Sequence, residues 1–224
     1  MRKWNFCAGP AVISEEVLSE VQSELLEYPD SGSSIMEMSH RSSTYMKVAL
    51  DAKQDLKDIL KIPENYEILF LQGGATHQFS MIPMNFNHLS GSADYITTGT
   101  WTKKAFIEGS KIMDLKEIYS SEKNNFTFAP DIENLELSDN AAYVHYCPNE
   151  TIQGNAIHKV PKINKPLVAD MSSVILSEPL EVDNFSLIYA GAQKNIGPAG
   201  LTIVIIKKEF MEHGNSNLPS LFRY

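Results

Sequence analysis

Lys194 stands in a loop of small residues between residues 190 and 200. Apolar segments flank the loop at 185–189 and 201–206, and both have the composition of buried strands. A lysine fixed between two strands can present its amine to a ligand, and such an amine can hold an aldehyde as a Schiff base. The pattern also fits the glycine turn of an ordinary hairpin with one exposed lysine, and the loop by itself leaves both readings open.

Asp170 follows a second apolar segment, at 166–169. A carboxylate at the buried end of a strand needs a positive or hydrogen-bond-donating partner. If the ligand is pyridoxal phosphate, Asp170 can keep the pyridine nitrogen protonated while Lys194 holds the aldehyde and later moves a proton. Asp170 and Lys194 together therefore predict this cofactor, which neither residue would do alone.

Three further features follow predicted strands, where the ligands of open α/β sheets gather. A glycine pair at 73–74 precedes a helix whose first N–H groups could bind a phosphate, although a plain turn is about as compatible. Trp101 could lie against a flat ring, but a single tryptophan also fits the core. The Thr151 hydroxyl could bond a phenolic oxygen.

The elements that must position these residues alternate along the chain. We expect strands at 67–71, 93–97, 116–119, 141–146, 166–169 and 186–189, with helices at 76–86 and 101–109. This order predicts an α/β fold with a mainly parallel sheet. Two amphipathic helices come first, one capped by Ser14 and one from about residue 44 to Pro63, and we expect both to be half-buried covers of the sheet.

Composition narrows the class of protein further. The net charge is -9 over 224 residues, which argues against a nucleic-acid surface and favours a small-molecule enzyme. Cys7 and Cys147 lack metal-ligand spacing, so no metal is expected, and no apolar leader or membrane span is evident. We therefore expect a cytoplasmic protein. Arg41 is the one arginine away from the chain ends, so a doubly anionic substrate finds one arginine clamp here rather than two.

Six segments, met in order along the whole chain, closely resemble the phosphoserine aminotransferase family of class V pyridoxal-phosphate-dependent aminotransferases. They are residues 5–10, 36–42, 73–76, 146–151, 169–173 and 192–195. The resemblance implies the aspartate-aminotransferase-like fold (fold type I), with an N-terminal arm at 1–14 and a cofactor-binding large domain at 15–224 whose sheet is sandwiched by helices. It also implies amino-group exchange between O-phospho-L-serine with 2-oxoglutarate and 3-phosphohydroxypyruvate with L-glutamate, in serine and in many bacteria pyridoxine biosynthesis.

The resemblance assigns a role to each matching residue. Lys194 is expected as the catalytic Schiff-base lysine, Asp170 as the pyridinium partner, Trp101 as the ring-stacking residue, Ala75 and Thr76 as backbone ligands of the cofactor phosphate, Thr151 as the ligand on the ring-hydroxyl side, Gln193 as a residue of the phosphate region, and His40 and Arg41 as the ligands of the substrate phosphate or the distal carboxylate of glutamate.

The resemblance also shows what is expected to be missing. Chains of the family continue into a smaller C-terminal domain, which carries the arginine for the substrate α-carboxylate, and that domain is expected to be absent here. Family members also form homodimers that share an Asn-Thr pair between subunits. Two alternatives stay open: another class V activity, such as alanine-glyoxylate or serine-pyruvate transamination or cysteine desulfuration, and a truncated, non-catalytic cofactor-binding fragment. His40 and Arg41 favour a phosphorylated substrate.

Overall fold

The computed structural model describes residues 2–224. Its helices are α1 (Glu15–Glu24), α2 (Ser43–Leu60), α3 (Gly74–Ser90), α4 (Thr100–Gly109) and α5 (Lys208–Glu212), with short 3-10 turns η1 (Ile35–Glu37), η2 (Glu122–Asn124), η3 (Ile132–Asn134), η4 (Val182–Asn184) and η5 (Ser220–Phe222). Its strands are β1 (Tyr66–Leu71), β2 (Ser92–Thr97), β3 (Asp114–Ser120), β4 (Val144–Tyr146), β5 (Asn149–Glu150), β6 (Asn155–Ala156), β7 (Leu167–Asp170), β8 (Leu187–Gly191) and β9 (Thr202–Lys207).

Within residues 2–224, seven of these strands form one sheet in the order β1-β9-β8-β7-β4-β2-β3. The pairs among β8, β7, β4, β2 and β3 are parallel, whereas β9 runs antiparallel to both of its neighbours, β8 and β1. The mainly parallel α/β sheet expected from the sequence is therefore confirmed. Strands β1, β2, β4, β7 and β8 all end at the same edge, which is where a ligand site is expected.

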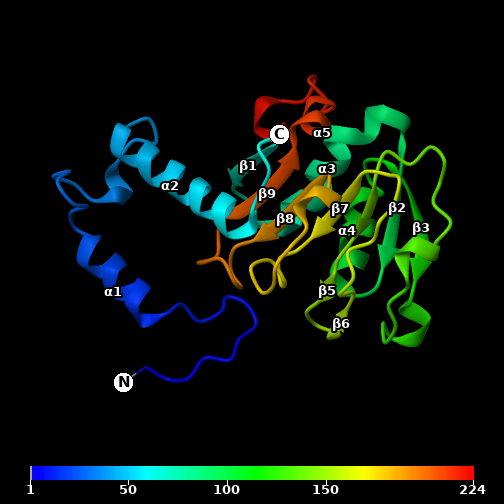
Figure 1. Ribbon diagram of the computed structural model, residues 1–224, viewed down its shortest axis with the longest axis horizontal. Coiled ribbons are helices and arrows are strands. Elements are labelled where there is room, and N and C mark those ends of the chain that lie inside the picture. Colours follow the sequence, from blue (N-terminus) through cyan, green and yellow to red (C-terminus); the bar gives the residue numbers. More distant parts are fainter. Residues whose placement is uncertain (1) are drawn as a thin grey trace.

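Each face of the sheet has its own apolar core. On one face, Phe79 and Phe86 of α3 pack with Ala105 of α4 and Phe210 of α5. On the other face, Leu56 and Leu60 from the last turns of α2 pack with residues of the loops between β7 and β8. Figure 1 shows α3 and α4 against the sheet and α2 reaching it with one end. The short strands are buried on both faces, as their apolar sequences predict.

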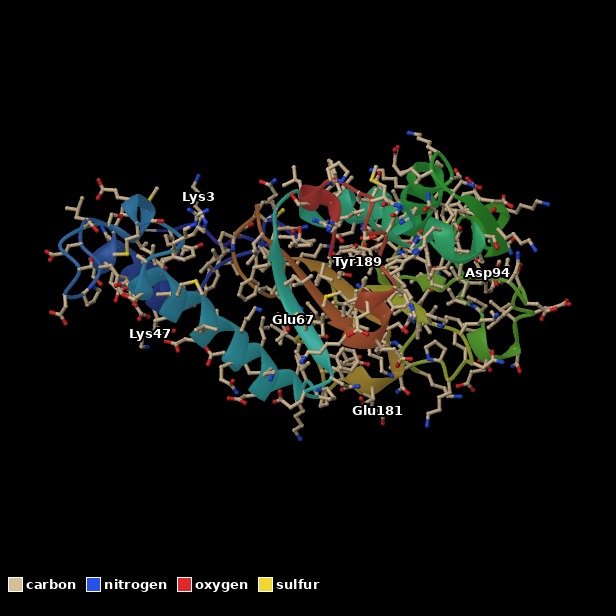
Figure 2. All side chains as sticks on the ribbon, turned by 90° about the horizontal axis from the view of Figure 1, so that it is seen from above. Lys3, Lys47, Glu67, Asp94, Glu181 and Tyr189 are labelled. Atoms are coloured by element: carbon tan, nitrogen blue, oxygen red, sulfur yellow. The ribbon has the colours of Figure 1, made fainter. Side chains whose placement is uncertain are left out.

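The expectation that both N-terminal helices are half-buried covers is wrong for α1. None of the ten described residues of α1 is buried, and only Leu56 and Leu60 of α2 are. Figure 1 shows α1 and the first half of α2 to one side of the sheet, and in Figure 2 Lys47 of α2 lies far from the side chains packed around Tyr189 of β8. The amphipathic pattern predicts that a helix has an apolar face, but not which surface covers it. The predicted cap of α1 is confirmed, since Ser14 Oγ accepts a hydrogen bond from Val17 N at 3.3 Å.

Candidate active site

A cavity of about 320 Å³ opens at the sheet edge where the parallel strands end. Its walls come from the segments that follow β1, β2, β4, β7 and β8. The lining residues are Gly73, Gly74, Ala75, Thr76, Phe79, Trp101, Cys147, Asn149, Thr151, Asp170, Ser172, Ser173, Gln193, Lys194, Ala199 and Gly200. All seven of the residues expected to bind the cofactor are in this list. The volume is in the range of a small-molecule site.

Asp170 is the last residue of β7 and is 5% exposed. Its Oδ1 accepts hydrogen bonds from Ser172 N at 3.0 Å and from Ser172 Oγ at 2.7 Å. Gly191 N of β8 donates in turn to Ser172 Oγ at 3.0 Å, which ties the ends of β7 and β8 together. Burial raises the pKa of the Asp170 carboxyl, and the bonds from Ser172 oppose that shift. Ser172, with its small side chain, thus holds the Asp170 carboxyl in place at the wall of the cavity.

Lys194 lies in the loop that joins β8 to β9. These strands pair antiparallel, so the loop does close a hairpin, as the simpler interpretation of the sequence had it. The lysine is not an exposed turn residue, however, because it lines the cavity and its Nζ donates a hydrogen bond to Thr151 Oγ1. Burial lowers the pKa of the Lys194 ammonium, and the nearby Asp170 charge acts against this shift. Part of the amine population is therefore neutral at a lower pH than for a lysine in water.

The N-terminal arm packs against the Lys194 loop. Ala11 N donates to Gln193 O at 2.8 Å. A Cβ added to Gly9 would lie 3.0 Å from Lys194 Cγ, so the backbone of the arm passes directly over the lysine stem. These contacts fix one side of the loop that carries the amine.

The start of α3 forms the end of the cavity near β1. Gly73 is the N-cap, with φ +96°, and it offers no side chain to cap the first turn of the helix. Gly74, Ala75 and Thr76 line the cavity there. The first N–H groups of a helix lack partners within the helix and attract anions, so this end suits a phosphate.

Trp101 forms another wall, in the first turn of α4. Lys104 Nζ lies 4.8 Å from the centroid of its ring, on α4 itself. Trp101 Nε1 is buried and has no hydrogen-bond partner among the described residues. Because Trp101 lines the cavity, its indole is a candidate for stacking on a heteroaromatic ring.

The expected substrate ligands are not brought to the cavity. His40 and Arg41 lie in an exposed turn between η1 and α2, and neither appears among the residues that line the site. The structure thus brings together the residues expected to bind the cofactor but leaves those expected to bind the substrate apart from them.

Sequence reasoning missed four polar residues that hold the site together. Ser172 anchors Asp170, and Asn149 exchanges hydrogen bonds with Ser173 at 2.7 and 2.8 Å beside the cavity. Glu150 is 0% exposed and bonds the start of α4. The Asp-x-Ser spacing of Ser172 is a recognisable local turn signal, whereas Asn149 and Glu150 contact partners distant in sequence.

The Aminotransferase class-V family pattern matches residues 3–219, and the chain belongs to that family. A curated relative from Acinetobacter baumannii, a phosphoserine aminotransferase, is 51% identical over 225 residues. That match covers 100% of this chain and 63% of the relative.

Solved structures give the same result. The phosphoserine aminotransferase from Bacillus circulans subsp. alkalophilus superimposes with a TM-score of 0.95 at 45% identity, covering 100% of this chain and 62% of that one. The PLP-bound phosphoserine aminotransferase from Trichomonas vaginalis gives a TM-score of 0.89 at 37% identity, covering 100% and 63%. The chain thus spans somewhat over three fifths of the length of these relatives.

Proposed function

We propose that this protein is a pyridoxal-phosphate-dependent phosphoserine aminotransferase of serine biosynthesis. It would transfer the amino group of O-phospho-L-serine to 2-oxoglutarate, which gives 3-phosphohydroxypyruvate and L-glutamate, and the same reaction in reverse. The observation that carries the proposal is the meeting of Asp170 and Lys194 in one cavity, each with its pKa shifted by burial. The names of the relatives supply the substrate class.

The groups around the cavity fit pyridoxal phosphate. An amine for the aldehyde comes from Lys194, a carboxyl for the pyridine nitrogen from Asp170, and a flat wall from Trp101. Backbone N–H groups of Ala75 and Thr76 at the start of α3 would take the phosphate, with Gln193 nearby, and Thr151 would lie on the side of the ring hydroxyl. When bound, the cofactor supplies a conjugated ring that accepts the electron pair left as the α-proton departs.

The protein's own contribution is to orient groups and to move a proton. Lys194 lines the cavity, where it would hold the aldehyde of the bound cofactor, and its free amine would act as the base that takes and returns the substrate's α-proton. Its lowered pKa favours this role, because the amine must be neutral to act as a base. The Asp170 carboxylate would pair with the ring nitrogen of the bound cofactor and favour its protonated form, and the hydrogen bonds from Ser172 would hold the carboxylate in position.

The lysine assignment is tested by reduction. Borohydride treatment of the protein loaded with pyridoxal phosphate, followed by peptide mass spectrometry, is expected to place the adduct on Lys194. Lys194→Ala should lose both this adduct and transamination, whereas Lys123→Ala, at an exposed site, should keep both. An adduct that stays at full yield in Lys194→Ala would remove the basis of the mechanism.

The substrate assignment depends on His40 and Arg41. We propose that they receive the substrate phosphate, or the distal carboxylate of glutamate, once the N-terminal segment is brought over the cavity. The contacts of Gly9 and Ala11 with the Lys194 loop support this, since they hold the arm before α1 at the site. Arg41→Ala should raise KM for phosphoserine by about 10–100-fold, as expected for a lost charged hydrogen bond, with little change for unphosphorylated serine. Equal losses for both amino acids would favour another class V activity.

The assembly, the domain division and the setting are further parts of the proposal. We place the cofactor-binding domain at 15–224 with the arm at 1–14, in a cytoplasmic homodimer with shared active sites, and with pyridoxine synthesis as a second pathway. Exposed apolar side chains on the N-terminal segment, such as Trp4 and Leu26, support an association surface. No helix of residues 2–224 is long and apolar enough to cross a membrane. Sedimentation of the purified protein tests the dimer, and cell fractionation tests the setting.

A further inference from the structure

A two-stranded ribbon, β5–β6, lies beside the cavity and carries Thr151 in its turn. The residue before the turn, Glu150, is completely buried although its side chain is a carboxyl group. Burying a carboxylate costs free energy unless both of its oxygens are hydrogen-bonded. The hydrogen-bond partners of Glu150 therefore indicate its role.

Both carboxylate oxygens of Glu150 bond the first turn of α4. Oε1 accepts from Thr102 N at 2.8 Å and from Thr102 Oγ1 at 2.6 Å, and Oε2 accepts from Trp101 N at 3.0 Å. Gln153, on the other side of the ribbon turn, bonds Thr100 through both ends of its amide, at 3.1 and 2.7 Å. The ribbon thus holds all three residues that begin α4.

Glu150 performs the function that an N-cap side chain usually performs. The N-cap of α4 is Gly99, which has no side chain for it. A serine or aspartate at that position would satisfy the same N–H groups locally, without burying a carboxylate about 50 residues away in sequence. The remote cap therefore gives something that a local cap cannot, namely a fixed distance between the ribbon and α4.

Gly99 leaves room for the Glu150 carboxylate that a side chain at residue 99 would fill. Its φ of -178° is ordinary extended backbone, so conformation does not require glycine. A Cβ there would lie 2.4 Å from Glu150 Cδ, closer than any packed contact. The absent side chain leaves the space that the carboxylate occupies.

We propose that Glu150 is a positioning residue that fixes Trp101 and Thr151 relative to each other in the wall of the cavity. Trp101 follows the cap directly and Thr151 follows Glu150 directly, so one carboxylate fixes two walls of the site. Thr151 also receives the hydrogen bond from Lys194 Nζ, so the clamp extends to the amine. The effect on cofactor binding rests on the function proposed above, whereas the effect on Trp101 does not.

The test uses Trp101 as its own reporter. In a Trp4→Phe background Trp101 is the one remaining tryptophan of the sequence. Glu150→Gln replaces one carboxylate oxygen with an amide donor that faces backbone N–H groups. Gly99→Ala displaces the carboxylate but removes no polar group from the protein. Both variants should shift Trp101 emission to longer wavelength without cofactor and speed amide exchange at residues 101–102. Both should also weaken pyridoxal phosphate binding about tenfold, the effect of one lost charged hydrogen bond.

Glu136→Gln is the matched control, because it makes the same change at an exposed site, and it should leave all three measurements at parental values. A double-mutant cycle should show coupling, since Gly99→Ala should do less harm when Glu150→Ala has already made room. If Glu150→Gln does not fold, Gly99→Ala and Gln153→Ala decide by the same criteria.

The proposal is overturned if folded variants melt at lower temperature yet keep parental Trp101 emission and cofactor affinity, because Glu150 would then only stabilise the fold. If the parent itself fails to bind pyridoxal phosphate, the proposed function falls, while the emission and exchange measurements still decide the clamp.

Discussion

At the scale of single residues, Asp170 and Lys194 of the proposed cofactor site both lie where burial disfavours their charged forms. Burial raises the pKa of Asp170 and lowers that of Lys194, so each group is held in surroundings that disfavour its charge. Such groups are expected to stabilise a bound ligand rather than the fold, so replacing one should weaken ligand binding without lowering the stability of the folded protein.

Asp170→Asn should not weaken the ligand-free fold at neutral pH. Because the folded pKa lies above the ordinary 3.8, the folded protein keeps a proton that the unfolded chain has released, and stability falls as pH rises through that window. The variant lacks this penalty and keeps an oxygen for Ser172. We expect its urea midpoint at pH 7 to equal or exceed the parental one, with cofactor binding weakened about 10–100-fold. A lower midpoint with unchanged binding would contradict this.

His145 gives the opposite pH dependence. It is fully buried, stacks on Tyr95 with 4.5 Å between ring centroids, and bonds Tyr189 OH at 2.8 Å. Burial lowers its pKa to about 3, against 6.5 for the free side chain. The unfolded chain therefore binds the extra proton first, and stability is lost as pH falls from 6.5 toward 3, by up to about 1.4 kcal/mol per pH unit.

Replacing this histidine should therefore flatten the acid limb of the stability curve. His145→Gln is expected to be less stable than the parent at pH 7 but to lose less on going to pH 5, as measured by urea unfolding at both values. His158→Gln, at an exposed histidine, should retain the parental slope. A parental slope in His145→Gln would show that another group takes up the proton.

The sequence drew attention to Asp170 because a charge at the buried end of an apolar strand needs a partner, and to Lys194 because its loop of small residues is held between two apolar segments. Both residues line the cavity, and their roles there stay predictions. Glu150 could not be found in this way, since it lies in a polar segment, just before the β5–β6 turn, and its partners, Trp101 and Thr102, are about 50 residues away. His40 was assigned by resemblance alone, and Arg41 by resemblance and as the one arginine away from the chain ends; both lie in an exposed turn apart from the cavity.

At the scale of elements, the start of α3 is a junction that constrains two adjacent glycines in different ways. Gly73 has φ +96°, and a Cβ there would lie 2.5 Å from His77 Nδ1. Gly74 also has positive φ, at +67°, but has nothing within 4 Å of such a Cβ. A side chain at Gly74 would therefore meet backbone strain alone, whereas a side chain at Gly73 would meet both backbone strain and a clash with His77.

Gly74→Ala should cost about 1 kcal/mol of stability, the usual penalty for a side chain in left-handed backbone. Gly73→Ala should cost clearly more, and should also displace the helix start and weaken the binding of the cofactor phosphate. Urea unfolding together with cofactor titration of the two variants measures the difference. Equal effects would mean that His77 moves aside without loss.

The elements were largely predictable because alternating apolar segments and helices report a parallel sheet. The direction of β9 was not, since a continuous apolar run such as 202–206 is the same whether the strand is parallel or antiparallel. The surroundings of α1 were not predictable either, because amphipathic spacing does not identify the covering surface.

At the scale of the whole molecule, the chain has a well-packed body and an N-terminal segment, residues 2–50, with few contacts to that body. Exposed large apolar side chains concentrate in this segment: Trp4, Phe6, Val12, Val17, Leu18, Val21, Leu25, Leu26, Met36, Tyr45, Met46 and Leu50. So much apolar surface on one segment is unusual for a protein that works alone. The proposed dimer gives it a function, since a second copy can cover it.

The local stability of α1 tests this directly. A ten-residue helix is marginal in water, and the exposed Arg2–Glu15 ion pair at 3.5 Å adds little. In a dilute monomer, amides of α1 should exchange orders of magnitude faster than those of β8, which is buried throughout. If a second copy covers the helix, its protection should rise with protein concentration, and Val21→Glu should abolish that rise while β8 stays unchanged. Hydrogen exchange at two concentrations gives both readings, and α1 protection equal to that of β8 in the dilute sample would show that the helix is covered within a single chain.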